Sequence, residues 1–378
     1  MRFVICCVVV MLLALATDIS AATTIAHGVH AVDWSTFAKL GLTLAVFGAA
    51  LGTGNLTLAD WAKRLDPNGT VPVIVELLGQ SNEVLEDMQW RQGNLPTGHR
   101  TTVRTGLPAV AWRLLNQGVA PSKSTTAQID EQAGMLEAWS EVDKDLLLLN
   151  GNAASFRLSE ARAFIEAMNQ EFTQTLFYGN AGLAPEEFTG LSVRYSLSTA
   201  ANGENVIKAG GAGSDNASIW LVAWGEETIT GIFPKGSKAG LIHEDFGEVT
   251  VEMVAGLPGS RMRAMQERFQ WKAGIALKDW RYVVRICNID VSDLNAANVK
   301  TIINFMEQAV ETIPNRLGTP VFYMNRTMRR FLRREARESV GSGGGLTFEN
   351  FAGKRILTYD QIPIRIVDQL LNSEALVA

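Results

Sequence analysis

The chain has 378 residues, enough for two or three domains with a sizeable buried core. Its composition, with 47% hydrophobic and 19% charged residues, excludes a disordered, collagen-like or polytopic membrane protein. A net charge of −5 excludes a positive field around the whole molecule, so any contact with nucleic acid must be local.

The chain is poor in cysteine and histidine. Cys6 and Cys7 lie at the very start, and Cys287 is the single cysteine of the remaining sequence. The body therefore cannot form a disulfide framework or a cysteine zinc site, and we expect it to belong to a reducing compartment. Four histidines leave little scope for acid–base or metal chemistry near neutral pH.

The first 54 residues differ in character from the rest. Residues 1–22 resemble a secretory signal, with Arg2 ahead of an apolar run and small residues at the end. A second apolar stretch, 40–51, is shorter than the roughly 20 residues that a membrane-spanning helix needs. Either this leader is a true targeting segment, or it is upstream sequence joined to the body by a start codon chosen too early. The lone cysteine of the body favours the second alternative, so we expect residues 1–54 to lie outside the fold and their signal-like segment not to function.

The globular sequence is predicted to begin with an N-terminal arm, 55–88, which contains a short helix at 57–65. Residues 89 to about 126 follow as a long arm or hairpin, because polar and glycine-rich sequence surrounds β-type segments at 101–105 and 109–114. A two-stranded ribbon is marginally stable in water, so this hairpin needs another surface to lie on. The hairpin is thus a first indication of assembly.

The remaining sequence contains both helical and strand-like patterns. Residues 155–179 carry the clearest helix, with Ser159 as the expected N-cap and Gly179 as its end. Two further helices are predicted at 294–313 and 326–338, and strands at 216–233, 247–254, 280–286 and 362–367. The fold class is therefore α+β, with helices and strands segregated.

No segment predicts an active site. The chain has no P-loop and no Gly-x-Ser-x-Gly elbow, and Gly210 to Gly213 is interpreted as a turn. The cluster His243-Glu244-Asp245 is interpreted as a solvated turn, because a hydrolytic or metal role would need further ligands. We expect no catalytic residue, no metal, no cofactor and no small-molecule substrate.

A run of six arginines stands out near the C-terminus. Helical spacing places four of them on one face: Arg326, Arg330, Arg333 and Arg337. Such a face suits phosphate neutralisation or salt bridges to an acidic neighbour, and an ordinary solvated helix face remains the alternative.

Several short segments occur in an order that resembles one family of proteins. The segments are Leu176-Phe177-Tyr178-Gly179-Asn180, Pro185-Glu186-Glu187-Phe188-Thr189-Gly190-Leu191, Ser218-Ile219-Trp220-Leu221-Val222-Ala223-Trp224-Gly225, Phe233-Pro234-Lys235-Gly236-Ser237, Asp279-Trp280-Arg281-Tyr282-Val283-Val284-Arg285-Ile286, Val321-Phe322-Tyr323-Met324-Asn325-Arg326 and the tail 353–368. Together they resemble the major capsid proteins of tailed bacteriophages with the Hong Kong 97-type fold, in a podovirus-like group. The resemblance covers residues from about 55 to the C-terminus, and the leader is its one departure.

The resemblance implies a division of the body. The hairpin 89–137 would be the extended loop that lies over an adjacent subunit. Residues 138–190 would form the peripheral domain, with the spine helix at 159–178. Residues 191–378 would form the axial domain and the remaining strands of the peripheral domain.

The resemblance also implies a function in the virion. Subunits would assemble through pentamers and hexamers, in the cytoplasm of a bacterial host, into an icosahedral shell around double-stranded DNA. Scaffolding, portal and decoration proteins would be further partners, and contact with the packaged DNA would be weak and non-specific.

Eight residues are candidates for the subunit interface. Trp90, Trp112 and Trp139 lie in or beside the hairpin and would either anchor the interface or pack locally at the hairpin base. Lys123 lies in the hairpin and is a candidate donor for the lysine–asparagine crosslinks that some members of the fold form. The other candidates are Arg326, Arg330, Arg333 and Arg337, facing a neighbour or DNA.

Two rival functions remain open from the sequence. An encapsulin-like cellular nanocompartment would use the same fold to hold cargo enzymes. Taken at face value, the leader indicates an exported binding protein or hydrolase instead, and glycans at Asn55, Asn68, Asn216 or Asn325 would support that alternative.

Overall fold

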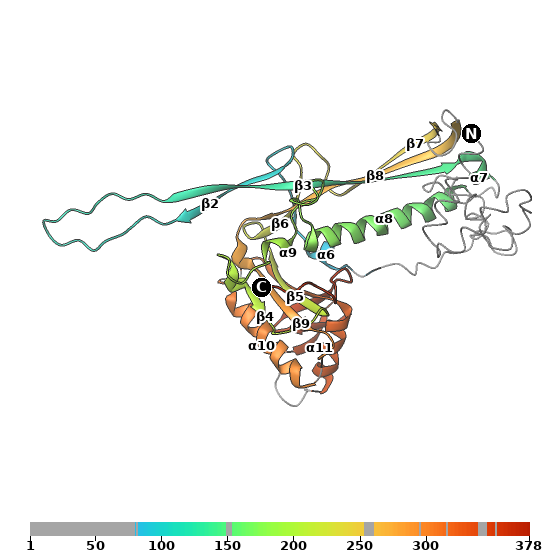
Figure 1. The fold of residues 1–378 in the computed structure, drawn as a ribbon. Helices are drawn as coiled ribbons and strands as arrows, with labels where there is room; N and C mark the ends of the chain where they lie inside the picture. The colour runs from blue at the N-terminus through green and yellow to red at the C-terminus, as the bar shows by residue number, and fades with distance from the viewer. Residues whose placement is uncertain are drawn as a thin grey trace, which may run out of the picture.

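The computed structural model describes residues 80, 82–148, 153–252, 261–294, 296–314, 317–338, 346–351 and 354–378. The leader and the helix expected at 57–65 lie outside the described residues. The described chain has three parts: a long hairpin, a long helix lying along a narrow sheet, and a lobe built on a second stretch of sheet (Figure 1). No helix among the described residues is long and apolar enough to cross a membrane.

The hairpin is formed by β2 (Gly98–Gly106) and β3 (Thr125–Asp143), which pair antiparallel. Residues 107–124 form no strand and extend beyond the ladder as a loop (Figure 1). The strand expected at 109–114 is therefore wrong. The ladder ends where Gly106 and Thr125 pair at an irregular register. Pro108 and Pro121 lie inside the loop near its two ends, and neither has an N–H to donate.

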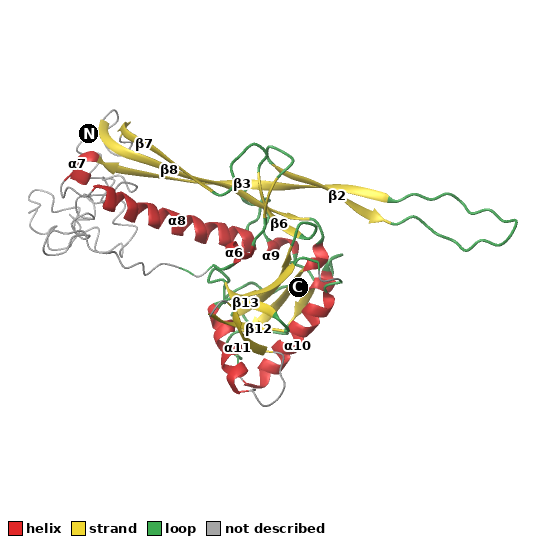
Figure 2. Ribbon diagram, turned by 180° about the vertical axis from the view of Figure 1, so that it is seen from behind, coloured by secondary structure: helices red, strands yellow, loops and turns green. Residues whose placement is uncertain are grey.

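The narrow sheet carries the long helix. The second half of β3 pairs with β8 (Arg261–Leu277), and β8 pairs with β7 (Leu241–Glu252). After α7 (Lys144–Leu148), helix α8 (Ala153–Tyr178) lies along one face of this sheet, where Phe164 stacks on Phe269 at 5.5 Å between ring centroids (Figure 2).

The end of α8 is confirmed, and its expected start is wrong. The helix ends at Tyr178, and Gly179 donates its N–H to Thr175 at 2.8 Å. At the other end the helix already begins at Ala153, so Ser159 is an interior residue and not the N-cap. Two alanines open the helix, and their high helix propensity carries it past the serine.

The turn expected at His243-Glu244-Asp245 is also wrong, because these residues lie within β7. Their charges suit the strand, since opposite-charge pairs across neighbouring strands stabilise a sheet. Glu244 faces Arg268 of β8 at 2.6 Å, and His243 contacts Glu267 of β8 at 2.9 Å.

The lobe is built on the end of the sheet opposite to the hairpin. Its strands run in the order β11 (Leu346–Phe351), β12 (Lys354–Tyr359), β13 (Ile362–Ile366), β10 (Thr319–Met324), β5 (Asn216–Trp224), β9 (Val283–Asp290) and β4 (Val206–Lys208). Strand β6 (Ile229–Phe233) joins this part to β8, and β1 (Trp90–Gln92) pairs with β6. Every residue of β5 is buried, and its second part, from Ile219 to Trp224, is a continuous apolar run and not an alternation.

The strand expected at 216–233 is two strands. Residues 225–228 turn the chain between β5 and β6, with the N–H of Thr228 donated to the carbonyl of Gly225 at 3.3 Å. Likewise, residues 280–282 form a short 3-10 helix, η2 (Trp280–Tyr282), before β9 begins.

Both faces of the lobe sheet are covered. Helices α10 (Ala296–Thr312) and α11 (Arg326–Glu338) lie on one face, where Met306 and Leu332 belong to the same buried cluster. The other face packs against the C-terminal half of α8, with short α6 (Val84–Asp87), α9 (Leu191–Arg194) and the turn η1 (Gly203–Asn205) nearby. The two late helices are confirmed within two residues of their predicted ends.

Candidate subunit interface

The tip of the hairpin exposes an unusual amount of apolar surface. Trp112 is fully exposed, at 104% of the reference area, on a loop that extends away from the rest of the subunit (Figure 1). Its apolar neighbours on the loop are exposed as well: Leu107, Val110, Leu114 and Leu115. Large exposed apolar patches mark interaction sites, so this tip is suited to burial against another surface.

The tip also carries positive charge. Residues 107–124 contain Arg113 and Lys123 and no acidic residue, and both side chains are exposed. Ser122 donates a hydrogen bond across the loop to the carbonyl of Ala109 at 2.7 Å. A surface that combines aromatic, aliphatic and acidic groups would complement this tip.

Trp90 lies elsewhere. Its ring packs inside the subunit, with its centroid 5.8 Å from Phe172 and 5.9 Å from Trp271. Strand β1 holds it against the main core, so its contacts in the described subunit are those of local packing at the hairpin base.

Trp139 lies on the face of the narrow sheet that α8 leaves open. Its ring stacks on Phe246 with the centroids 5.6 Å apart, and its indole N–H is donated to Glu137 at 2.8 Å. The guanidinium carbon of Arg268 lies 5.6 Å from the Trp139 ring centroid, within the range of a cation–π contact. Met135 on the same face is exposed. Sequence reasoning missed Phe246 and Met135, because residues 241–252 have no regular alternation of apolar and polar residues and a register shift lies between Asp245 and Gly247.

The arginines of α11 are not equivalent. Arg326 is paired with Asp368 at 2.6 Å. Arg329 is half-buried, and burial is the main cause that lowers the pKa of its guanidinium. Arg337 lies in the last turn of α11, where side chains are outside the described part of the structure.

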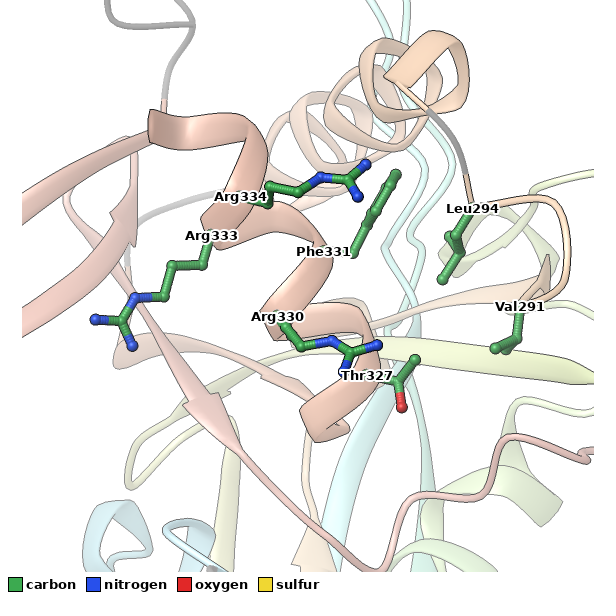
Figure 3. A pocket seen from close by; sticks show the side chains of 7 residues that line it. All are labelled: Val291, Leu294, Thr327, Arg330, Phe331, Arg333 and Arg334. Atoms are coloured by element: carbon green, nitrogen blue, oxygen red, sulfur yellow. The ribbon is translucent and has the colours of Figure 1, made fainter. Parts of the chain in front are cut away.

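The other arginines contribute to the lining of a pocket of about 700 Å³ on one side of α11 (Figure 3). It is lined by Arg330, Arg333 and Arg334, with Thr327, Phe331, Val291 and Leu294. This lining contains three cations and no carboxylate, beside three apolar side chains. The arrangement suits an acidic partner that also presents an apolar group.

The described residues contain no group of three or more His, Cys, Asp or Glu side chains that could hold a metal ion. The Nε2 atom of His243 contacts the carboxylate of Glu267, and its ring stacks on Phe269 with the centroids 4.8 Å apart. The one cysteine in the described part of the chain, Cys287, is buried, and burial raises the pKa of its thiol.

Comparison with known proteins gives the chain a clear set of relatives. The sequence model of a family described as "Major capsid protein GP7" matches residues 66–378. The structure is similar to a solved chain of bacteriophage Epsilon15, with 31% sequence identity and a TM-score of 0.69, covering 86% of this chain and 98% of that one.

More distant similarities were found as well. A chain of Microbacterium phage Oxtober96 is 10% identical with a TM-score of 0.40, covering 61% of this chain and 98% of that one. The SrpI encapsulin of Synechococcus elongatus PCC 7942 is 12% identical with a TM-score of 0.40, covering 63% and 98%. A search of curated proteins found no match.

Proposed function

Because this chain belongs to the major capsid protein GP7 family, and is therefore the structural protein from which a tailed phage builds its icosahedral shell, we propose that its subunits join through the hairpin tip and the basic face of α11. The expected Hong Kong 97-type fold is confirmed by the match to the Epsilon15 chain. The family is a structural one and not a family of enzymes. Capsid proteins of this kind self-assemble, so a second copy of the chain is the partner to consider first.

The rival functions lose their support. The family match and the 31% identity are to phage capsid proteins, which does not favour a nanocompartment. Asn216 and Asn325, two of the four possible glycosylation sites, are buried at 1% and 3% exposure, so the folded chain has no room for a glycan there. Asn55 and Asn68 lie outside the described residues.

The hairpin tip is the main support for the proposal. Burying a large apolar side chain contributes about 1.5–3 kcal/mol, and the tip exposes several that touch nothing in their own subunit core. An adjacent subunit would supply that burial. The same contact would stabilise a two-stranded ribbon that has no core of its own.

The open face of the narrow sheet is the acceptor we propose for the tip. It presents Trp139 stacked on Phe246 beside three carboxylates, Glu137, Glu141 and Glu244, which the strand register places on this face. The aromatic pair, Glu137 and Glu141 complement an apolar tip with two positive charges, whereas Glu244 is already paired with Arg268 on the same face. Trp112 and Trp139 would then meet across one interface, while Trp90 would hold the base of the hairpin inside its own subunit.

Lys123 contributes charge to this contact in our proposal. Nucleophilic attack by a lysine amine requires an activating acid–base neighbour, and Lys123 is exposed at the tip. We therefore propose a noncovalent joint in which Lys123 faces the carboxylates of the neighbouring sheet.

The pocket on α11 supports a second contact. Arg330 lies on the same side of α11 as Phe331, Val291 and Leu294, whereas Arg333 points to the other side of the helix (Figure 3). An acidic protein segment would fill such a pocket better than a bare phosphate would. We therefore propose that these arginines, with Arg326 and Arg337 on the same helix face, meet a neighbouring subunit, and that contact with packaged double-stranded DNA is weak and non-specific.

The proposed subunit divides as the sequence indicated: an arm at 55–88, the extended loop at 89–137, a peripheral domain at 138–190, and an axial domain from 191 with the returning strands β7 and β8. A contact between two different surfaces forms a closed ring when its rotation divides a full turn evenly, and pentamers and hexamers are the rings we propose as intermediates. Scaffolding, portal and decoration proteins would complete the particle, assembled in the cytoplasm of the host.

Replacing Trp112 by alanine tests the proposal. We expect fewer assembled shells, since the largest apolar side chain of the tip is lost, while the subunit stays folded because Trp112 is fully exposed in it. Sedimentation and electron microscopy measure assembly, and circular dichroism checks folding. Gln117→Ala, a polar neighbour on the same loop, is the control and should assemble normally. An unchanged yield of shells from Trp112→Ala would contradict the proposal.

A further inference from the structure

One apolar face of helix α8 is buried in the C-terminal half of the helix and exposed in the N-terminal half. In the C-terminal half, Phe172 and Leu176 on this face are buried in the main core. In the N-terminal half, the same face carries Leu158 and Ile165, which are 56% and 46% exposed. Seven residues separate Leu158 from Ile165 and Ile165 from Phe172, so the three side chains line up along the helix. The core of the subunit thus continues along α8 as an apolar stripe without a cover among the described residues.

The chain enters the described structure beside this stripe. The backbone N–H of Gln80 is donated to Glu166 Oε1 at 2.9 Å, and Glu166 is the residue next to Ile165. The side chain of Gln80 is fixed as well, because Gln369 donates a hydrogen bond to its Oε1 at 2.7 Å. Asn82 pairs with Val367 just downstream. The residues that precede Gln80 therefore start from a fixed point next to the exposed stripe.

The segment before Gln80 has the composition of a cover. Residues 71–78 contain six large aliphatic side chains: Val71, Val73, Ile74, Val75, Leu77 and Leu78. Its length is also sufficient. Leu158 lies roughly 10 Å along the helix from Ile165, at 1.5 Å per residue, and eight extended residues reach about 26 Å.

We propose that residues 71–78 of the same chain dock on the Leu158–Ile165 stripe of α8. The arm would run from Gln80 towards the N-terminal end of α8 and extend the subunit core along the helix. Its own chain is the natural source, because a segment tethered at Gln80 is held at a high effective concentration next to the stripe. This intramolecular contact does not depend on how subunits assemble.

Crosslinking tests the proposal. Two variants are made, one with Ile165→Cys and Leu78→Cys and the other with Leu158→Cys and Ile74→Cys. In both, Cys6 and Cys7 are replaced by serine, and Cys287 is kept because it is buried. We expect a short bis-maleimide to join each pair within one chain, both in unassembled subunits and in shells. Peptide mass spectrometry identifies the joined residues, and a denaturing gel separates monomers from dimers.

The matched control pairs Ile74→Cys with Ala163→Cys, an exposed position two residues from Ile165 and about 200° around the helix. This pair should stay unjoined. Circular dichroism of each variant checks that the subunit keeps its helical content. Absence of both crosslinks in folded protein would overturn the proposal. A dimer as the main product would overturn it too, because the cover would then come from a neighbouring chain.

A second variant checks the stripe itself. With Leu158→Ser and Ile165→Ser we expect faster proteolytic cleavage before Gln80, since the arm would lose its apolar surface. Ala163→Ser with Ala167→Ser, on exposed positions away from the stripe, should leave the cleavage rate unchanged. Equal cleavage rates in the two variants would count against docking.

Discussion

Arg285 and Glu374 form an ion pair that is almost wholly removed from water, at 5% and 4% exposure of their side chains. The guanidinium donates to Glu374 Oε2 at 2.8 Å and to the carbonyl of Tyr195 at 3.0 Å, and Tyr178 donates its hydroxyl to Glu374 Oε1 at 2.6 Å. The pair thus connects the C-terminal segment, strand β9 and the end of α8. It fixes the junction between the long helix and the lobe.

Glu374→Ala should destabilise the subunit by about 3–5 kcal/mol, because a buried charge that loses its partner stays uncompensated. Urea unfolding of unassembled subunits, followed by tryptophan fluorescence, measures the loss. Asp130→Ala breaks the exposed pair between Arg100 and Asp130 and should leave the unfolding midpoint nearly unchanged. A Glu374 variant as stable as the Asp130 control would show that the buried pair is not a structural joint.

Sequence reasoning could not find this joint. Arg285 and Glu374 are 89 positions apart, and neither pattern nor spacing relates them. Sequence did place Trp112 and the α11 arginines among the candidates, because an aromatic in a hairpin and a run of arginines are local signals. It could not separate Trp112 from Trp90, since exposure is decided by the fold: one ring lies at the tip, and the other packs on Phe172 and Trp271.

Elements were predictable where their signal is local and strong. The helices at 294–313 and 326–338 have a clear apolar stripe with a stop signal, and they form as α10 and α11. The hairpin β11–β12 and strand β7 were missed or misplaced. Strand β7 has charged residues on both faces, and its partners become visible only when β8 lies beside it.

The start of α8 is fastened to β7 and β8 by one arginine. Arg157 contacts Asp245 at 2.7 Å and also pairs with the buried Glu267, which in turn contacts His243. Hydrogen bonds from Arg157 and from the N–H of Gly247 hold the pKa of Asp245 below its usual value of 3.8. The stabilising contribution of this carboxylate is therefore complete above pH 3.8 and is lost as the pH falls through the lower, folded-state pKa.

Asp245→Asn should lower the melting temperature at neutral pH by a small amount, because a partly exposed pair contributes at most about 1 kcal/mol. The difference between wild type and variant should shrink as the pH falls below 3.8. Calorimetry of unassembled subunits from pH 7 down to the onset of acid unfolding measures it. Glu227→Gln, at the exposed turn after β5, is the control. A difference in melting temperature that grows on acidification would contradict the lowered pKa of Asp245 in the folded subunit.

At the scale of the whole molecule, the two proposed contacts are independent. The tip lies far out on the hairpin, and the basic pocket lies on the lobe beside α11 (Figures 1 and 3). Each subunit can therefore hold one neighbour through its ribbon and meet another surface through its lobe. Loss of one contact should weaken assembly without unfolding the subunit.

Arg330→Glu combined with Arg333→Glu should reduce shell assembly, because both exposed side chains would then repel the acidic partner proposed for the pocket. Light scattering during assembly in the absence of DNA measures the effect. Lys235→Glu with Lys238→Glu reverses two exposed cations elsewhere and is the control. Normal empty shells that fail only to retain DNA would assign these arginines to the genome instead of a neighbouring subunit.

Strand β3 runs unbroken through 19 residues, from the edge of the tip loop at Thr125 to the helix junction at Asp143. At about 3.3 Å per residue this is a rod of roughly 60 Å. Its far half lies in the ribbon, and its near half forms the floor beneath α8. A neighbouring subunit that binds the tip therefore contacts one end of a continuous strand. A tilt of that end would rotate the part of the sheet on which α8 packs. The orientation of one subunit would therefore affect the orientation of α8 in its neighbour.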